Sequence, residues 1–563
     1  MKDLIKKLKA QFREYNIDGY VIPKNDEFFS EYSNKDRLKA ISNFSGSAGY
    51  AIILEKTNLL FVDGRYTIQA KIESEKRFQI IGIDKLYNCK IFKNLSLGID
   101  PRLFTKNQID KFFSNNNVKL IEENLIDKII KTKKESIKPF FSLDKDIAGE
   151  SYQNKIGKII NFLRKNKLDH IFITSPENVA WLLNIRGHDN PNSPIPNSHL
   201  IISKNNRKII IANKQKLKKL INQKIVKKNE MIEPENIEKF FKNLSGKKIS
   251  IDKKTCSIYF EKILNKRFKV IKKDDPTYLL KSIKNKTEID NMIKAHIIDG
   301  AALTKFIYWI KNVNKKKITE VDAQNKLEKF RKQNKNYLYP SFNTISGSGK
   351  NGAIVHYRAT KKNTKKINKN DIFLCDSGGQ YKYGTTDVTR TICFTKQNQK
   401  IKKIFTYVLK GHIGVANTDL NKKKTGKEID ITARKYLKLN KLDYSHGTGH
   451  GVGYFLNVHE GPQAISKFNS IKIQEGMILS NEPGFYKKNR FGIRIENLIY
   501  AKKINNKFFF KNLTFAPIDK DLIDQNLLTN KEKDYLFKYH LETYSMISKY
   551  LNVNERKWLA SLI

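Results

Sequence analysis

A loose internal repeat constrains the fold of this 563-residue chain more than any other feature of its sequence. Residues 16–23 (NIDGYVIP), 41–46 (ISNFSG) and 59–63 (LLFVD) have counterparts about 150 residues later, at 167–174 (KLDHIFIT), 181–187 (WLLNIRG) and 209–212 (IIIA). Each copy runs from an amphipathic helix into a short apolar strand and then into further strands and helices. The repeat predicts two related α/β domains, with a boundary near the Lys- and Ser-rich stretch 132–148.

A third region begins at about residue 285, where Thr287 is expected to cap a long helix. From residue 340 onward, Gly-rich turns alternate with short β-type runs at 371–375, 477–480 and 491–495. The tail from about 518 contains a capping box, TNKE at 529–532, followed by an apolar stripe that predicts a packing helix or a dimer contact. The predicted fold is α+β, with domains at 1–145, 146–284 and 285–563, the last including the tail.

The charge balance raises the question of a nucleic-acid partner. Lys and Arg number 108 against 56 Asp and Glu, which gives a net charge of +52, and such an excess is typical of polyanion binders. The lysines are scattered through every segment, however, and the chain is also rich in Asn and Ile, which indicates an AT-rich codon bias. We expect solvated faces and no specific nucleic-acid partner, and a polyanion-binding surface stays open as the alternative.

Cysteine usage and hydropathy predict the compartment. The four cysteines lie far apart without a CxxC pair, which argues against a disulfide framework and against a thiolate zinc site. The first nine residues read as an amphipathic helix, and no run of 18 apolar residues occurs. A cytoplasmic location without membrane spanning is therefore expected.

Two aspartates flank a turn rich in Gly and Tyr. A hairpin centred between residues 381 and 382 places Asp376 directly opposite Asp387, about 5 Å apart on one face. Like charges so placed repel each other, so the pair needs a cation or a shared proton. A surface or turn role is the alternative for these aspartates alone.

Three later segments supply further ligands. His446 and His450 lie in the run HGTGHGVG, whose glycines let the backbone approach a ligand closely. Glu482 ends an apolar strand just before a turn. Strand alternation directs Arg494 and Glu496 to one face, where a buried charged pair requires a metal or an anion.

Four carboxylates and one imidazole suffice to bind two divalent ions that share ligands; these residues are Asp376, Asp387, His450, Glu482 and Glu496. Oxygen-rich sites favour harder ions such as manganese, or cobalt and iron. Two ions about 3.5–4 Å apart lower the pKa of a shared water and polarise a carbonyl. The site therefore predicts hydrolysis of an amide bond.

The chain resembles the pita-bread metallopeptidase family, and within it the three-domain cytosolic Xaa-Pro aminopeptidases. The resemblance spans nearly the whole chain, and its marks are residues 341–349, 352–357, 446–459, 481–484 and 492–497 together with the aspartate pair. It implies creatinase-like N-terminal domains followed by a pita-bread catalytic domain. It also implies a homodimer that acts on peptides with proline in the second position, with two divalent ions, manganese first and cobalt, iron or zinc as alternatives.

The resemblance implies a role for each ligand. Asp376 and Asp387 hold one metal, and Asp387 or Glu496 links it to the second metal, which His450 and Glu482 also bind. Glu482 is in addition implied as the general base.

The resemblance also implies substrate-binding residues. His356 and His459 hydrogen-bond the substrate carbonyl and the oxyanion, and His446 lines the pocket for the proline. Arg494 sits beside Glu496 and orients it. Thr389 is expected to support the hairpin rather than to act as a nucleophile, because no activating base stands beside it.

Two other functions compete with this interpretation. A prolidase-type dipeptidase uses the same metals on a free dipeptide, but the duplicated N-terminal domains and the tail favour the aminopeptidase. A non-catalytic binding protein on the same fold would be expected to have lost metal ligands, and this chain keeps all five positions.

Overall fold

The computed structural model describes residues 2–130 and 137–563. It divides into two compact units, which meet in the sequence between Thr277 and Tyr278. The stretch 132–148, where the sequence predicts a domain boundary, lies partly outside the described residues. The three predicted domain ranges stay a prediction.

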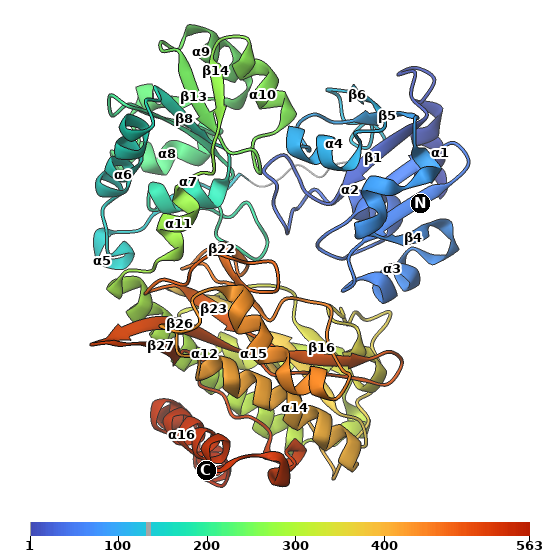
Figure 1. The fold of residues 1–563 in the computed structure, drawn as a ribbon, viewed down its shortest axis with the longest axis vertical. Coiled ribbons are helices and arrows are strands. Elements are labelled where there is room, and N and C mark those ends of the chain that lie inside the picture. Colours follow the sequence, from blue (N-terminus) through green and yellow to red (C-terminus); the bar gives the residue numbers. More distant parts are fainter. Residues whose placement is uncertain (1, 131–136) are drawn as a thin grey trace. The chain divides into compact units, whose positions relative to one another are not determined.

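A six-stranded mixed sheet forms the first half of the N-terminal unit, with the strand order β4-β3-β2-β1-β5-β6 (blue in Figure 1). β1 pairs with β2, and β2 with β3, in antiparallel orientation. The other three pairs are parallel: β3 with β4, β1 with β5, and β5 with β6. Its main elements are α1 (Lys2–Ala10), β1 (Gly19–Pro23), α2 (Arg37–Ser42), β2 (Tyr50–Leu54), β3 (Asn58–Val62), α3 (Thr67–Glu73), β4 (Gln79–Gly82), β5 (Ser96–Ile99), α4 (Lys106–Phe112) and β6 (Asn117–Leu120).

A second six-stranded sheet follows, with the order β12-β11-β10-β8-β13-β14 (teal and green in Figure 1). Its strands join with the same sequence of antiparallel and parallel pairings as those of the first sheet. Its elements are β7 (Phe141–Ser142), α5 (Lys145–Ala148), α6 (Tyr152–Lys165), β8 (His170–Ile173), α7 (Pro176–Leu182), β9 (Ile185–Arg186), β10 (His199–Ser203), β11 (Lys208–Ile211), α8 (Lys214–Asn222), β12 (Met231–Ile232), α9 (Ile237–Asn243), β13 (Lys248–Ile251), α10 (Ile258–Asn265), β14 (Lys269–Lys272) and α11 (Thr277–Ser282).

Local details confirm that the two sheets belong to related domains. The carboxylate of Asp18, just before β1, accepts the Ser96 amide at 2.7 Å, and Asp169, just before β8, accepts the Lys248 amide at 3.0 Å. Asn43 after α2 and Asn184 in the turn after α7 both adopt left-handed backbone, with φ of 61° and 52°. Asn tolerates this conformation better than most residues. The repeat predicted from the sequence is therefore structural.

Both faces of the first sheet are buried. On β1, Tyr20 and Ile22 belong to the hydrophobic cluster on one face, and Val21 belongs to the cluster on the other. Side chains alternate between the faces of a strand, so a strand covered on both sides must be apolar throughout. This explains why the strands of the repeat appear as continuous apolar runs.

The second unit combines long helices with small antiparallel sheets. A three-stranded sheet has the order β16-β17-β20, and a five-stranded sheet has the order β22-β21-β23-β26-β27. The elements of this unit are α12 (Lys286–Asn312), α13 (Glu320–Lys332), β15 (Tyr337–Pro340), β16 (Ile345–Ser348), β17 (Phe373–Ser377), β18 (Gly379–Tyr381), β19 (Gly384–Thr385), β20 (Val388–Ile392), α14 (Gln399–Ala416), α15 (Gly426–Leu439), β21 (Gly449–Gly451), β22 (Glu460–Ile465), β23 (Ile478–Asn481), β24 (Gly484–Lys487), β25 (Phe491–Arg494), β26 (Asn497–Ile504), β27 (Lys507–Asn512), α16 (Asn530–Ile547) and α17 (Val553–Ala560).

The helix starts test two sequence predictions. α12 begins at Lys286 and is capped by Asn285, whose side chain accepts the Glu288 amide at 3.0 Å while the Glu288 carboxylate accepts the Asn285 amide. The prediction that Thr287 caps this helix was wrong, because the reciprocal Asn-x-x-Glu capping box starts the helix two residues earlier. The predicted capping box of Thr529 and Glu532 at the start of α16 is confirmed.

The apolar stripe of the tail is a packing surface within this unit. Its members are at most 7% exposed, and all but Thr543 join hydrophobic clusters with residues of α12 or α14; they are Leu536, Tyr539, Thr543, Ile547 and Leu551. Among the helices of residues 2–130 and 137–563, none has both the length and the apolarity that a bilayer crossing requires.

Candidate active site

The two aspartates come from neighbouring strands. Asp376 lies on β17 and pairs with Thr389 of β20, whereas Asp387 directly precedes β20. The prediction that Asp376 lies directly opposite Asp387 was wrong, because the hairpin turns at residues 382–383, with Tyr381 opposite Gly384. A register shift of two residues preserves the face. Burial raises the pKa of Asp376, and the charge of Asp387 still raises it further.

His450 and two glutamates complete a compact cluster. The ligand atoms of Asp387, His450 and Glu496 all lie within 4.8 Å of one another. On β21, His450 places Nε2 3.4 Å from Asp387 Oδ2 and 3.5 Å from Glu482 Oε1. Its Nδ1 hydrogen-bonds to the carbonyl oxygen of Gly451 at 2.9 Å, which leaves Nε2 directed at the carboxylates.

Both glutamates lie at strand ends. Glu482 follows β23, and Glu496 lies between β25 and β26. Burial raises the pKa of Glu496 well above its ordinary value, and the charges of Asp387, Glu482 and Asp376 raise it further. The structure thus brings all five predicted ligands into one electrostatic cluster.

The cluster has an excess of buried carboxylates that a divalent cation would neutralise. Oδ1 of Asp376 is buried and accepts no hydrogen bond from the described residues. Burial raises the pKa of Glu482 to about 7. Burial opposes the protonation of His450, but its hydrogen bond to Asp387 and the charge of Glu482 outweigh this effect and raise its pKa to about 9. Buried carboxylates without enough positive charge are costly, and oxygen donors with one imidazole suit hard or borderline metal ions.

Arg494 binds the carboxylate of Asp376 directly. Its Nη2 donates to Asp376 Oδ2 at 2.6 Å, and its Nε donates to Thr389 Oγ1 at 3.0 Å. Thr389 in turn donates to Glu496 Oε2 at 2.7 Å. Arg494 therefore reaches Glu496 through Thr389, and its direct carboxylate partner is Asp376, which the sequence did not indicate.

Tyr486 is a site residue that the sequence analysis missed. On β24, its hydroxyl accepts from Arg494 Nη1 at 2.6 Å and hydrogen-bonds to His446 Nε2 at 2.9 Å. It thereby connects the predicted proline-pocket residue to the network of the carboxylates. A signal was available, because Tyr486 lies four residues after Glu482, in the hairpin of β24 and β25 that also contains Arg494.

The predicted substrate-binding histidines lie on three loops. His459 stacks edge-on against His450, with ring centroids 4.4 Å apart, and so stands beside the cluster. His356 lies in a turn whose neighbouring carbonyl, that of Val355, accepts from Arg494 at 3.4 Å. His446 and His459 thus lie beside the network of the carboxylates, and His356 directly follows a residue whose carbonyl oxygen that network binds.

A second network, also missed, fixes the glycine-rich loop. Asp430 on α15 accepts from Thr448 Oγ1 at 2.6 Å and from Arg434 Nε at 2.8 Å. Arg434 also donates to the carbonyl oxygen of His446 at 2.7 Å. α15 therefore holds the loop between His446 and His450 in place. No local motif in the sequence marks Asp430 and Arg434, the two residues that make these contacts.

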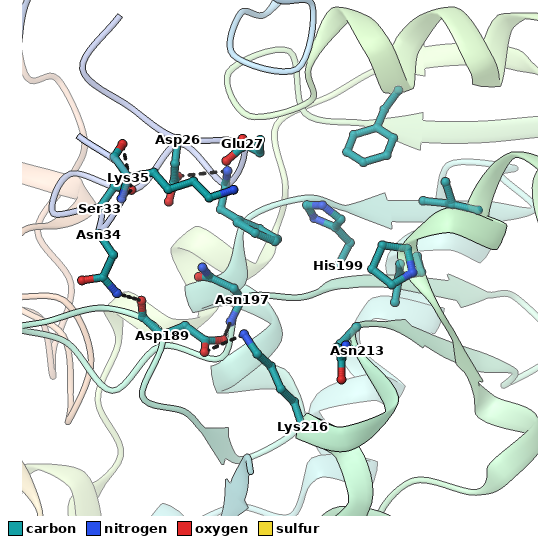
Figure 2. A pocket seen from close by; sticks show the side chains of 16 residues that line it. Asp26, Glu27, Ser33, Asn34, Lys35, Asp189, Asn197, His199, Asn213 and Lys216 are labelled. Atoms are coloured by element: carbon teal, nitrogen blue, oxygen red, sulfur yellow. Dashed lines mark hydrogen bonds and ion pairs between the residues drawn. The ribbon is translucent and has the colours of Figure 1, made fainter. Parts of the chain in front are cut away.

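The N-terminal unit contains a separate cavity of about 200 Å³. Figure 2 shows it beside His199, with Asp189 bonded to Lys216 at 2.7 Å. The ring of Phe28 lies 5.0 Å from that of His199. The charged groups at Asp189 and Lys216 neutralise each other, so this part of the cavity lacks the excess of carboxylates that marks the site of the second unit.

Family models match four consecutive parts of the chain. Residues 5–122 and 131–288 each match a creatinase/prolidase N-terminal domain, residues 290–503 match metallopeptidase family M24, and residues 507–562 match the C-terminal region of peptidase M24. The predicted combination of creatinase-like N-terminal domains with a pita-bread catalytic domain is thereby confirmed.

Relatives align along nearly the whole chain. A probable Xaa-Pro aminopeptidase P of Laccaria bicolor is 34% identical over 98% of this chain and 92% of its own length, and Xaa-Pro aminopeptidase 1 of Dictyostelium discoideum is 34% identical over 99% and 96%. The crystal structure of X-prolyl aminopeptidase from Caenorhabditis elegans, described as a cytosolic enzyme with a di-nuclear active site, superposes with a TM-score of 0.91 at 28% identity and covers 100% of this chain and 98% of its own. The chain therefore belongs to metallopeptidase family M24 and, within it, to the Xaa-Pro aminopeptidase P family.

Proposed function

We propose that this chain is an aminopeptidase that removes the first residue from peptides with proline in the second position. The observation that carries the proposal is the cluster of Asp387, His450 and Glu496 in a chain that superposes over its full length on an X-prolyl aminopeptidase. Metal-ligand positions that converge in this way favour a catalytic protein over a binding protein on the same fold.

The proposed cofactor is a pair of divalent ions, with manganese as the preferred metal. Asp376, Asp387, His450, Glu482 and Glu496 would hold them, and the di-nuclear site described for the nematode enzyme supports this number. The preference for manganese rests on the donor set, which has four carboxylates and no thiolate. When bound, the ions lower the pKa of the attacking water and polarise the scissile carbonyl.

Glu482 is the proposed general base. Its Oε1 lies 3.5 Å from His450 Nε2 within the carboxylate cluster, and a carboxylate held beside the attacking water can take up and release its proton. Ser480 Oγ donates to Glu482 Oε1 at 3.2 Å and orients the carboxylate. Glu482 accepts a proton from the attacking water and delivers it to the proline nitrogen, which leaves as a secondary amine when the C–N bond breaks.

Histidines on the surrounding loops are proposed to bind the substrate. His356 and His459 donate hydrogen bonds to the carbonyl oxygen as negative charge develops on it. His446, held by Tyr486, lines the side of the pocket that receives the proline. Because the bond before proline has no N–H, this side of the site needs no acceptor for an amide proton.

A prolidase function is less favoured. The prolidase of Pyrococcus furiosus superposes with a TM-score of 0.51 at 26% identity and covers 63% of this chain. The comparison therefore leaves about a third of the chain unmatched, whereas the nematode aminopeptidase accounts for the whole of it. The additional domain and tail agree with a peptide substrate rather than a free dipeptide.

A substrate comparison tests the proposal. The manganese-loaded protein is given an Xaa-Pro-Pro tripeptide, the matching Xaa-Pro dipeptide and an Xaa-Ala-Pro tripeptide, and the released first residue is quantified. We expect rapid cleavage of Xaa-Pro-Pro and little action on the other two. Faster cleavage of the dipeptide would identify a prolidase, and equal cleavage of Xaa-Ala-Pro would refute the role of proline.

A cytoplasmic location and a homodimeric assembly are also proposed. A cytoplasmic enzyme agrees with four free cysteines, which suit a reducing compartment, and with the description of the nematode enzyme as cytosolic. A homodimer, implied by the family resemblance, stays a prediction that light scattering of the purified protein would test.

A further inference from the structure

Glu460 forms a buried ion triad with two lysines. Lys281 Nζ lies 3.1 Å from Glu460 Oε2, and Lys284 Nζ bonds to Glu460 Oε1. The side chains of both lysines are 1% exposed, and that of Glu460 is 2% exposed. Lys284 Nζ also donates to the carbonyl oxygen of Lys281 at 2.8 Å, which holds the two lysines together.

This triad is costly to bury. Two ammonium groups share one carboxylate, so the group carries a net positive charge that is almost completely removed from water. Burial of charged groups costs several kcal/mol for each ion, and an apolar trio of similar volume is often as stable. A contribution to stability therefore does not by itself account for the triad.

The position of Glu460 connects the triad to the active site. Glu460 directly follows His459, whose ring stacks edge-on against His450. It is also the first residue of β22, and it pairs with Gly451, the residue after His450. The carboxylate thus fixes the end of the loop on which His459 lies.

The lysines are anchored independently of that loop. The Lys284 amide donates to the carbonyl oxygen of Gly476 at 3.0 Å, and Ile283 forms a bridge with Met477, just before β23. Lys284 also lies next to Asn285, the cap of α12. The two ammonium groups therefore stand on a segment fixed by the five-stranded sheet and by α12.

We propose that Lys281, Lys284 and Glu460 form a clamp that positions His459 over the metal ligand His450. None of the three is among the proposed metal ligands or substrate-binding residues, so they are proposed as positioning residues. The proposal rests on the proposed function, because it is through His459 that the clamp acts on the reaction.

Hydrogen exchange tests the clamp without any enzymatic activity. Amide exchange of residues 453–462 is measured in the wild type, Lys284→Met and Lys311→Met. Lys311 is a matched control, since it pairs with Asp519 at 2.8 Å elsewhere in the same unit. We expect faster exchange of this segment in Lys284→Met alone, and unchanged exchange would overturn the proposal. Should Lys284→Met fail to fold, Lys281→Met replaces it, because it keeps the bonds of Lys284 Nζ to Glu460 and to the main-chain carbonyl oxygen of residue 281.

A double-mutant cycle tests the action through His459. Lys284→Met is expected to lower kcat on Xaa-Pro-Pro by about tenfold or more, because a small misplacement of a reacting group is costly. KM and bound metal should stay unchanged, and Lys284→Arg should restore kcat. In a His459→Ala background, Lys284→Met should have no further effect. An equal loss in both backgrounds would overturn the proposal, whereas absence of cleavage by the wild type would refute the proposed function and leave hydrogen exchange to decide on the clamp.

Discussion

Replacing Arg494 by Met tests how far the proposed metal site depends on the buried guanidinium of this residue. The Arg494 side chain is 2% exposed, and it donates to Asp376 Oδ2, to Thr389 Oγ1 and to the hydroxyl of Tyr486 at 2.6, 3.0 and 2.6 Å. Its removal leaves the Asp376 carboxylate buried without a positive partner, which typically costs about 3–5 kcal/mol. At about 2 °C per kcal/mol for a domain of this size, we expect a melting temperature lower by about 6–10 °C.

The effect of manganese on the melting temperature distinguishes a defect at the proposed metal site from a general loss of stability. A divalent ion at Asp376 would replace part of the lost positive charge, so manganese should recover more stability in Arg494→Met than in the wild type. Arg331→Met is the matched control: Arg331 is also buried and bonds to Asp299 at 2.8 Å, but Asp299 is not among the proposed metal ligands. The melting temperature of Arg494→Lys should lie between those of the wild type and Arg494→Met, because lysine keeps the positive charge but loses the several N–H donors of the planar guanidinium.

Differential scanning fluorimetry with chelated and manganese-loaded protein measures both effects. The reasoning would be refuted if Arg494→Met melted at the wild-type temperature in the chelated state. It would also be refuted if manganese stabilised Arg494→Met and Arg331→Met by the same amount.

Three further predictions concern the ligands, the substrate and pH. Asp387→Ala and Glu496→Ala should each abolish metal loading and activity together, measured by metal analysis and peptide cleavage; full activity with one ion per chain would contradict the two-metal assignment. His356→Ala should lower kcat while the bound metal stays unchanged, and loss of metal would instead make His356 a ligand. Burial lowers the pKa of His199 from 6.5 to about 4, so the unfolded chain takes up a proton before the folded chain does as the pH falls. Stability should therefore fall by about 1.4 kcal/mol for each pH unit between pH 6.5 and 4, and His199→Gln should flatten this slope in thermal melts, whereas an unchanged slope would show that His199 does not contribute.

The fold was predictable from the sequence because its signals are local. The strands of the repeat are apolar on both faces, and Asp18 and Asp169 stand at equivalent positions before the first strand of each sheet. The start of α16 was predictable from the capping box of Thr529 and Glu532. Thr287 was a wrong cap because Asn285 offered a better partner for Glu288.

The site was predictable only as a set of ligands. Which carboxylate the guanidinium of Arg494 contacts depends on the pairing of β17 with β20, and that register depends on where the hairpin turns. The contacts of Asp430 and Tyr486 join segments that are distant in the sequence or lie outside the motifs. Such contacts follow from tertiary packing, which no local pattern records.

A metal titration tests the central claim most directly, namely that Asp376, Asp387, His450, Glu482 and Glu496 hold two ions that the reaction needs. Protein stripped by a chelator is titrated with manganese while the bound metal and the first residue released from an Xaa-Pro-Pro peptide are measured in the same samples. We predict no cleavage by the stripped protein and full cleavage when two ions are bound to each chain. Cleavage by the stripped protein, or full activity with a single ion, would contradict the account.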